Sequence, residues 1–381
     1  MNRRTFLQTT GLSTAAIATG LTSCISSSGN KAYMDRHFHI SSGIHKIPKL
    51  RISMDRIVKE TVGLRPFRAS GPRLDCEMLG RKTIVHNYGH GGSGWSLSWG
   101  TGNIAREKAE ATGEKRFAVL GCGTVGIATA RLLQERGHEV TIYAKELPPH
   151  VTSFLATGTW SPAYRLCDPE KITPQLKADW EKACLFSFRT FQNLLGFNDI
   201  VSWVDEYVVR NDMPAANEMH GQLEIKGLLP ERVLLSRKEH PFKASYVARM
   251  SGMMFNIPSY LHKQLNDFML FGGKVKIREF KTLEDIDALE EKCVVNCTGL
   301  GAKFLFNDEE LTPVSGQLSC LIPQPEVTYK LNTQGASVIA RKDGIYLGGN
   351  GIVGNWDTTP SREQTEKVVT VLQELMQNMR G

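Results

Sequence analysis

The most constraining feature of the sequence is a glycine-rich turn between a predicted strand and a predicted helix. An apolar run at 116–120 precedes the pattern Gly-x-Gly-x-x-Gly at 121–126, and apolar residues at helical spacing follow. Gly121 permits a tight turn, Gly123 lets the backbone approach a pyrophosphate, and Gly126 allows the helix to pack closely on the strand. The helix amino terminus then faces the anion. This order predicts a dinucleotide-binding α/β unit with a parallel sheet.

The ends of this unit predict further cofactor contacts. Thr124 and Val125 open the helix, so their backbone N–H groups would face a phosphate. A second strand is predicted at 139–143, and Lys145 and Glu146 follow it. Glu146 could bind a ribose hydroxyl, whereas Lys145 could meet a phosphate or lie in solvent.

A second glycine-rich segment lies before this unit, at 84–96. Its glycines at 89, 91, 92 and 94 would let the backbone lie against a flat ring, because glycine has no Cβ. The following segment, 96–112, is predicted to be partly helical. Its first N–H groups could face a developing anion, as the N1/C2=O edge of a reduced flavin would require. His86 and His90, taken alone, are typical of structural histidines.

Composition limits the class of protein. The chain has 381 residues, which is enough for an enzyme with two interleaved domains. Hydrophobic residues at 41% and charged residues at 22% are typical of a folded globular protein. The net charge of +7 comes without a basic run, so we expect no nucleic-acid partner. The cysteines after Cys24 show neither Cys-x-x-Cys nor zinc-site spacing, so we expect neither a metal nor a required disulfide.

The amino-terminal segment predicts export. Arg3 and Arg4 precede an uncharged stretch at 11–23, which is typical of a twin-arginine signal and too short to span a membrane. The sequence at 21–24 resembles a bacterial lipobox ending in Cys24, although Cys24 could also be an ordinary cysteine in an uncleaved leader. We therefore expect a signal at 1–24, a linker at 25–34, and a periplasmic or envelope protein whose membrane contact is a lipid on Cys24 alone.

Several motifs together resemble the D-amino-acid oxidase and D-aspartate oxidase family. They are His-Asn-Tyr-Gly-His-Gly-Gly at 86–92, Gly-Leu-Arg-Pro-Phe-Arg at 63–68, and the segments 157–162, 294–299, 315–318 and 348–356. In the family, the segments that resemble 45–105 close the chain, whereas here they run directly into the strand at 116. The order resembles a circular permutation, which surface termini that lie close together would allow.

The resemblance implies the fold class and the domains. It implies a Rossmann-like FAD-binding α/β domain with a parallel sheet, built from 81–165 and 250–312. A second, largely antiparallel α+β domain for the substrate, with connecting helices, would comprise 35–80, 166–249 and 313–381.

The resemblance also implies FAD as cofactor and a D-amino acid as substrate. Arg65 would hold the substrate carboxylate, and the Gly92 carbonyl would accept the substrate amine. Ser337 stands where the family has a substrate-site tyrosine, and Arg341 could bind a second carboxylate or lie in solvent. The implied cofactor-binding residues are Gly91, Gly92, Ser93, Gly94, Trp95, Ser96, Gly121, Gly123, Thr124, Val125, Gly126, Lys145, Glu146, Thr152, Ser153, Thr157, Gly158, Trp160, Thr298 and Gly299.

The implied reaction is oxidative deamination, with hydride transfer to flavin N5 and oxygen or another acceptor taking the electrons. A second hypothesis, motivated by Ser337, is an exported lipoprotein that keeps the fold for a binding or scaffold role. A third is a nicotinamide-dependent reductase, but the segment 86–94 and Arg65 argue against it. The sequence does not indicate the oligomeric state.

Overall fold

The computed structural model describes residues 47–197, 199–212, 223–349 and 351–380. Within this part, residues 47–236 and 240–380 belong to one compact unit. The predictions for the signal at 1–24, for Cys24 and for the linker at 25–34 lie outside the described residues, as does the first part of the range 35–80.

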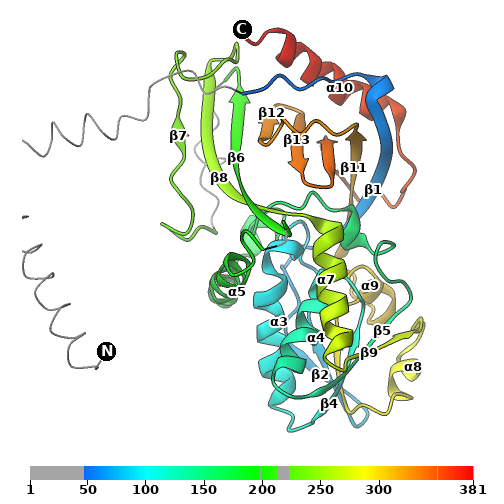
Figure 1. Ribbon diagram of the computed structural model, residues 1–381. Coiled ribbons are helices and arrows are strands. Elements are labelled where there is room, and N and C mark those ends of the chain that lie inside the picture. The colour runs from blue at the N-terminus through cyan, green and yellow to red at the C-terminus, as the bar shows by residue number, and fades with distance from the viewer. Residues whose placement is uncertain (1–46, 198, 213–222, 350, 381) are drawn as a thin grey trace, which may run out of the picture. The chain divides into compact units, whose positions relative to one another are not determined.

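A six-stranded sheet forms one layer of this unit (Figure 1). Its order is β2-β3-β10-β4-β5-β9; β2 is antiparallel to β3, and the other neighbours are parallel. The central strands are largely buried and rich in Val, as expected for parallel strands covered on both faces. The bounds are β2 (Cys76–Leu79), β3 (Lys82–His86), β4 (Arg116–Leu120), β5 (Glu139–Ala144), β9 (Lys274–Ile277) and β10 (Cys293–Asn296).

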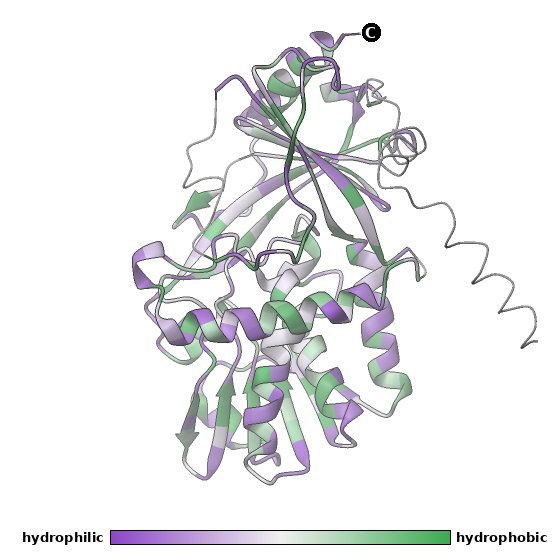
Figure 2. Cartoon of the chain, turned by 90° about the vertical axis from the view of Figure 1, so that its left-hand side faces the viewer, coloured by the Kyte–Doolittle hydropathy of each residue, from purple (hydrophilic) through white to green (hydrophobic). Residues whose placement is uncertain are grey.

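Helices cover one face of this sheet. α3 (Gly94–Glu110) packs against α4 (Thr124–Glu135) and α5 (Pro174–Gln192), and α4 packs against α7 (Ile257–Leu270) (Figure 1). Hydrophobic and hydrophilic residues alternate along the helices, as expected where one side is buried (Figure 2). A Cβ at Gly100 would lie 1.9 Å from the Ala183 carbonyl oxygen. Glycine therefore allows α3 and α5 to cross at backbone contact.

The opposite face of the sheet carries a smaller core. Ile286 from α8 (Leu283–Asp287) and Leu289 pack with Ala118 and Leu120 of β4. α9 (Gly301–Leu305) adds Leu305 to the same cluster. The parallel sheet is thus enclosed by apolar side chains on both sides.

A second sheet is largely antiparallel. Its order is β1-β11-β14-β13-β12-β6-β8-β7, with β15 paired to β11, and only its β6–β12 pair is parallel. α10 (Arg362–Gln377) packs on β13 and β14. The strand bounds are β1 (Ile57–Arg68), β6 (Val201–Arg210), β7 (Val233–Leu234), β8 (Tyr246–Phe255), β11 (Leu311–Leu321), β12 (Lys330–Thr333), β13 (Ala336–Arg341), β14 (Gly344–Gly348) and β15 (Ile352–Val353). The 3-10 helices are η1 (Met54–Arg56), η2 (Thr152–Leu155) and η3 (Pro169–Lys171).

The predicted fold class is confirmed, since a mainly parallel sheet with helices stands beside a largely antiparallel one. Two segments belong to a different sheet from the one that the predicted domain boundaries assign to them. β2 joins the parallel sheet because it forms an antiparallel pair with β3 directly after a two-residue turn. Residues 250–255 continue β8 in the second sheet, where they pair with β6.

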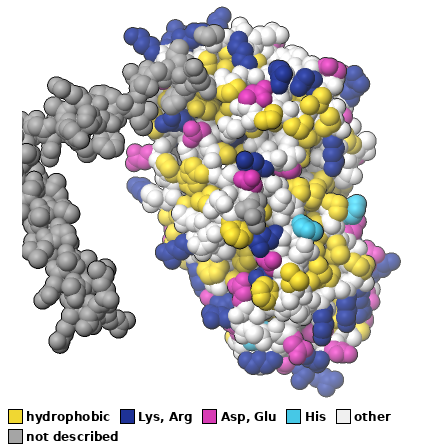
Figure 3. All heavy atoms as spheres, in the orientation of Figure 1, with side chains coloured by type: hydrophobic (Ala, Val, Ile, Leu, Met, Phe, Trp, Pro, Cys, Tyr) yellow, Lys and Arg dark blue, Asp and Glu magenta, His cyan; other side chains and the backbone are white. Residues whose placement is uncertain are grey.

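Among the residues that the structure describes, no helix is both long and apolar enough to cross a membrane. Within the described ranges, no group of three or more His, Cys, Asp or Glu residues could hold a metal ion. On the face seen in Figure 3, basic and acidic side chains are interspersed.

Candidate active site

The predicted cofactor segments meet at one edge of the six-stranded sheet. Gly121 directly follows β4, Lys145 directly follows β5, and Thr298 comes two residues after β10. The segment 87–94 follows β3 and leads into α3. Because β3, β10, β4 and β5 are parallel, all four segments leave the sheet at its carboxyl edge, where ligands of doubly wound sheets bind.

The turn between β4 and α4 requires its glycines. Gly121 has a φ of +105°, and a Cβ there would lie 2.5 Å from the Cys297 carbonyl oxygen. A Cβ at Gly126 would lie 2.1 Å from the Gly121 carbonyl oxygen. The start of α4 is therefore held against both the turn and the end of β10, as the glycine pattern predicts.

The amino terminus of α4 has polar groups suited to an anion. Gly123, its N-cap residue, provides no side-chain cap, and the Thr124 N–H donates to Ser153 Oγ over 3.0 Å. The Thr124 hydroxyl is buried and has no hydrogen-bond partner among the described residues. A buried unsatisfied hydroxyl beside the positive end of a helix fits a phosphate group.

The start of α3 lies beside this turn. The Trp95 indole N–H donates to the Ser153 carbonyl oxygen over 2.9 Å, and Ser96 Oγ accepts from the Ser161 N–H over 2.7 Å. Ser93, the N-cap residue of α3, makes no side-chain cap hydrogen bond within its helix. The segments that contain Ser93 to Ser96 and Thr152 to Ser161 are thus brought together, as predicted.

Other predicted cofactor residues differ in their surroundings. Trp160 is buried, and its indole N–H has no partner in the described part of the chain. Gly158 packs on the β8 backbone, because a Cβ there would lie 2.8 Å from the Phe255 carbonyl oxygen. Thr157 and Thr298 are half-buried and Gly299 has a φ of +58°, while Lys145 and Glu146 are exposed. Gly158 therefore serves packing, and the structure does not choose between Lys145 and Glu146.

The two histidines of the 86–92 motif are structural. His86 is fully buried, and its Nδ1 lies 3.2 Å from Asn296 Nδ2. His90 Nε2 lies 3.0 Å from Thr101 Oγ1, whose proton goes to the Leu97 carbonyl oxygen. His90 therefore donates from Nε2 and is neutral. Burial lowers the pKa of His90 to about 4.

Arg65 lies on β1 opposite Val314 of β11, in the second sheet. Its guanidinium passes over Gly316, where a Cβ would lie 2.2 Å from Arg65 Nη1. Burial lowers the pKa of Arg65, the nearby charge of Arg165 lowers it further, and Tyr164 opposes both effects. Among the described residues, no carboxylate forms an ion pair with Arg65.

Arg65 lies close to the 86–92 motif through its neighbour in β1. The Gly91 N–H donates to the Pro66 carbonyl oxygen over 2.8 Å, and Phe67 forms a β-bridge with His90. This connection brings a cation from the antiparallel sheet to the carboxyl edge of the parallel sheet. It agrees with the prediction that Arg65 and Gly92 belong to one site.

Sequence reasoning missed Tyr164 and Arg165. A Cβ at Gly92 would lie 2.4 Å from Tyr164 Cδ1, and one at Gly91 would lie 1.8 Å from the Arg165 carbonyl oxygen. Ser93 Oγ donates to the Tyr164 carbonyl oxygen over 3.0 Å. Their position directly after the 157–162 motif is the one signal in the sequence that could have indicated them.

The prediction that Arg341 binds a second carboxylate is wrong, and so is the alternative of a solvated side chain. Arg341 is buried and donates to both Asp343 carboxylate oxygens, at 2.8 Å and 2.5 Å, and to the Ala156 carbonyl oxygen at 2.8 Å. Its charge is already paired. Ser337 is half-buried on β13, and its hydroxyl donates to the Gly348 carbonyl oxygen over 3.3 Å.

Comparison with known proteins identifies the family. Residues 116–380 match the DAO family, described as FAD dependent oxidoreductase. The chain belongs to this family. Its cofactor is accordingly FAD, and the Thr124 hydroxyl, the start of α4 and the glycine turn are the groups that fit its phosphates.

Curated relatives include a D-amino acid oxidase of Dugesia ryukyuensis, 26% identical over 263 residues, covering 66% of this chain and 75% of that protein. The D-amino-acid oxidase of Rubrobacter xylanophilus is 26% identical over 270 residues, covering 70% of this chain and 78% of that protein. Among solved structures, glycine oxidase from Bacillus cereus has a TM-score of 0.48 at 16% identity, covering 68% of this chain and 77% of that one.

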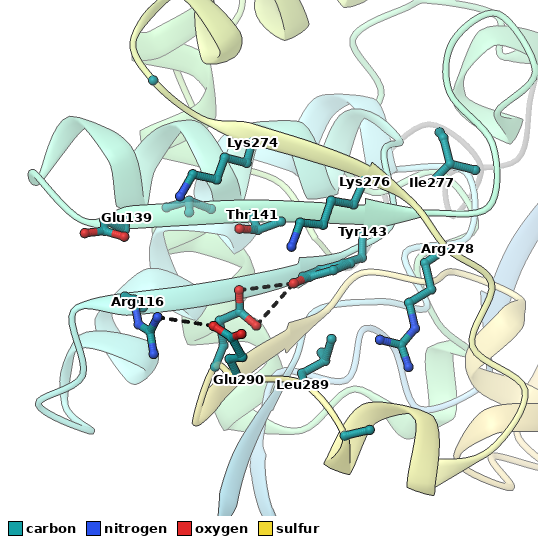
Figure 4. Close-up of a pocket in the computed structure, with 14 residues that line it drawn as sticks. Arg116, Glu139, Thr141, Tyr143, Lys274, Lys276, Ile277, Arg278, Leu289 and Glu290 are labelled. Atoms are coloured by element: carbon teal, nitrogen blue, oxygen red, sulfur yellow. Dashed lines mark hydrogen bonds and ion pairs between the residues drawn. The ribbon is translucent and has the colours of Figure 1, made fainter.

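A pocket of about 590 Å³ lies apart from this site, on the face of β4, β5 and β9 (Figure 4). In this pocket Arg116 lies 3.5 Å from Glu290, and the Tyr143 hydroxyl donates to Glu291 over 3.2 Å. The pocket contains none of the predicted cofactor or substrate residues.

The buried neutral His90 predicts a pH dependence of stability. Its pKa is lower in the folded chain than in the unfolded chain, so its contribution is complete above pH 6.5 and is lost as the pH falls towards 4. The quantity to compare is the fall in the free energy of unfolding from pH 7.5 to pH 4.5. We expect this fall to be about 2 to 3 kcal/mol larger in the parent than in His90→Gln. Urea denaturation at each pH measures this difference.

The matched control is His150→Gln, because His150 is exposed. Its loss of stability with pH should parallel that of the parent. If His90→Gln also followed the parent at every pH, a buried neutral His90 would be excluded.

Proposed function

We propose that the protein oxidatively deaminates D-amino acids to 2-oxo acids and ammonia, with oxygen taking the electrons from FAD. The observation that carries this proposal is the Arg65 guanidinium, which is half-buried without a carboxylate partner in the described residues. The neighbouring Pro66 accepts a hydrogen bond from Gly91 of the glycine-rich 86–92 segment. A partly desolvated cation without a partner is costly, so such a site favours an anionic ligand. The curated relatives named D-amino-acid oxidase support the same reaction.

The residues of this chain bind and orient the substrate. The planar Arg65 fork matches the two oxygens of the substrate carboxylate. The Gly92 carbonyl accepts a hydrogen bond from the substrate amine, which fixes the orientation of Cα. When FAD is bound, it supplies the acceptor for the hydride that leaves Cα. The amine loses a proton, and water then hydrolyses the imino acid to the 2-oxo acid and ammonia.

Arg65 provides the test of this proposal. We expect Arg65→Ala to lower kcat/KM for D-amino acids by about 30-fold to several thousand-fold, or about 2 to 5 kcal/mol, because the substrate carboxylate loses its partner. Arg65→Lys should recover only part, because a point charge lacks the fork. Anaerobic flavin reduction by D- and L-amino acids gives the rates.

Neither Arg65 variant should lose FAD, because the cofactor contacts come from other segments. Arg136→Gln is the charge-matched control, since Arg136 is exposed at the end of α4. If no D-amino acid reduces the parent, or if Arg65→Ala is reduced as fast as the parent, the proposed reaction is wrong. The binding or scaffold role would then be favoured.

We also propose that the chain is circularly permuted relative to its family. The family match begins at residue 116, yet residues before it supply β1, β2, β3 and α3. The contacts of residues 50–52 with α10 support this: the Leu50 N–H donates to Met376 Sδ over 3.3 Å, and Gln373 Nε2 donates to the Ile52 carbonyl oxygen over 2.7 Å. A start near residue 47 thus lies beside the last helix.

The permutation predicts that the family order is also a viable order. The variant would run from residue 116 to 380, continue through a flexible linker to residue 47, and end at residue 115. We expect it to bind FAD and to be reduced as the parent is. Absorbance spectroscopy of the purified variant measures both properties. Aggregation or loss of FAD, with a parent that retains it, would contradict the proposal.

For localisation we propose twin-arginine export and lipidation at Cys24, supported by Arg3, Arg4 and the segment 21–24 of the sequence. Cys24→Ala should move the protein from the membrane fraction to the soluble periplasmic fraction, because the lipid would be its anchor. Cell fractionation in a bacterium with a twin-arginine pathway measures this. Unchanged fractionation of Cys24→Ala would contradict a lipid anchor.

A further inference from the structure

The arginines near the candidate site fall into two groups. Arg68 lies 2.9 Å from Asp308, and Arg341 lies 2.5 Å from Asp343. Among the described residues, Arg65 and Arg165 have no such carboxylate partner. The Arg165 carbonyl lies against Gly91, and the Gly91 N–H donates to Pro66, the neighbour of Arg65, so the two unpaired cations belong to segments that meet.

The segment that carries Arg165 is built into the site. The Tyr164 ring packs on Gly92, and the Arg165 carbonyl oxygen lies against Gly91. Arg165 has a φ of +50°, which is uncommon for a residue other than glycine and is often found at functional sites. These contacts fix both residues beside the segment that meets Pro66 and hence Arg65.

The two side chains are also oriented together. Arg165 Nε donates to the Tyr164 hydroxyl over 3.2 Å, and the Arg165 guanidinium lies 5.6 Å from the centre of the Tyr164 ring. Tyr164 is 48% exposed, so the pair stands at the accessible side of the site. Ser337 provides no phenol on β13, whereas the exposed Tyr164 offers one to a ligand.

We infer that Tyr164 and Arg165 complete the substrate site, with the Tyr164 phenol binding the carboxylate held by Arg65 and Arg165 binding a second carboxylate on the substrate side chain. The inference rests on the proposed function and makes the substrates acidic D-amino acids. One carboxylate would leave one of the two cations unpaired, whereas a dicarboxylate pairs with both and removes their mutual repulsion.

The first measurement is binding of non-reacting acids to the FAD-loaded protein. Succinate carries two carboxylates, and succinamate has nearly the same shape with one. We expect succinate to bind about 30-fold more tightly than succinamate to the parent, and this ratio to fall close to one in Arg165→Gln. Tyr164→Phe should weaken both ligands by a similar factor. Ligand-induced shifts in Tm and flavin absorbance give the dissociation constants.

The second measurement is anaerobic flavin reduction by D-aspartate and D-glutamate against D-asparagine and D-glutamine. We expect the acid-to-amide ratio of kcat/KM to exceed about 30 in the parent and in Arg136→Gln, and to collapse in Arg165→Gln. Arg165→Lys should restore part of it. The Tm of each variant without ligand shows whether it is folded.

The outcomes separate the two proposals. If the parent prefers the amides, or if Arg165→Gln keeps the acid preference, the role of Arg165 is wrong while the proposed reaction stands. If no D-amino acid reduces the parent, the proposed reaction fails, and the succinate-to-succinamate ratio still decides the role of Arg165. Equal binding of succinate and succinamate to the parent overturns the inference.

Discussion

The site depends on backbone contacts that only glycine permits at the carboxyl edge of the parallel sheet. Gly126 lies against the Gly121 carbonyl, and Gly121 lies against the end of β10, each closer than a Cβ would allow. These contacts join β4, α4 and β10 and aim the start of α4 at the ligand. The unpartnered Thr124 hydroxyl lies in the same place. This packing positions the groups that would hold the FAD phosphates.

A second set of glycine contacts connects the two sheets. Gly91 binds Pro66 of β1 through its N–H and lies against Arg165, while Gly316 leaves room for the Arg65 guanidinium. The cation that would bind substrate thus comes from the antiparallel sheet, and the carbonyl that would orient the amine comes from the loop after β3. Substrate orientation is therefore a property of how the sheets join, and neither sheet provides it alone.

The sequence predicted those parts of the site that depend on local patterns. A glycine motif between a strand and a helix requires the same turn wherever it occurs, so the β4–α4 turn, a helix within 96–112 and the fold class could be predicted. The Arg341 prediction failed although its partner Asp343 is only two residues away, because a hairpin decides whether two nearby side chains meet. β2 was misplaced because hydrophobic pattern does not say which sheet a short strand joins.

What the sequence alone determined is the glycine turn at the start of α4, since glycine spacing acts over a few consecutive residues. Only the tertiary structure decided which charges remain without partners. Four arginines near the site have the same side chain. Among the described residues, Arg68 and Arg341 are paired with aspartates, whereas Arg65 and Arg165 are not. For Arg68 the pairing depends on a contact between segments far apart in the chain, and for Arg341 it depends on the shape of a hairpin. The local sequence pattern indicates neither. Two half-buried cations without carboxylate partners would favour a ligand with two carboxylates.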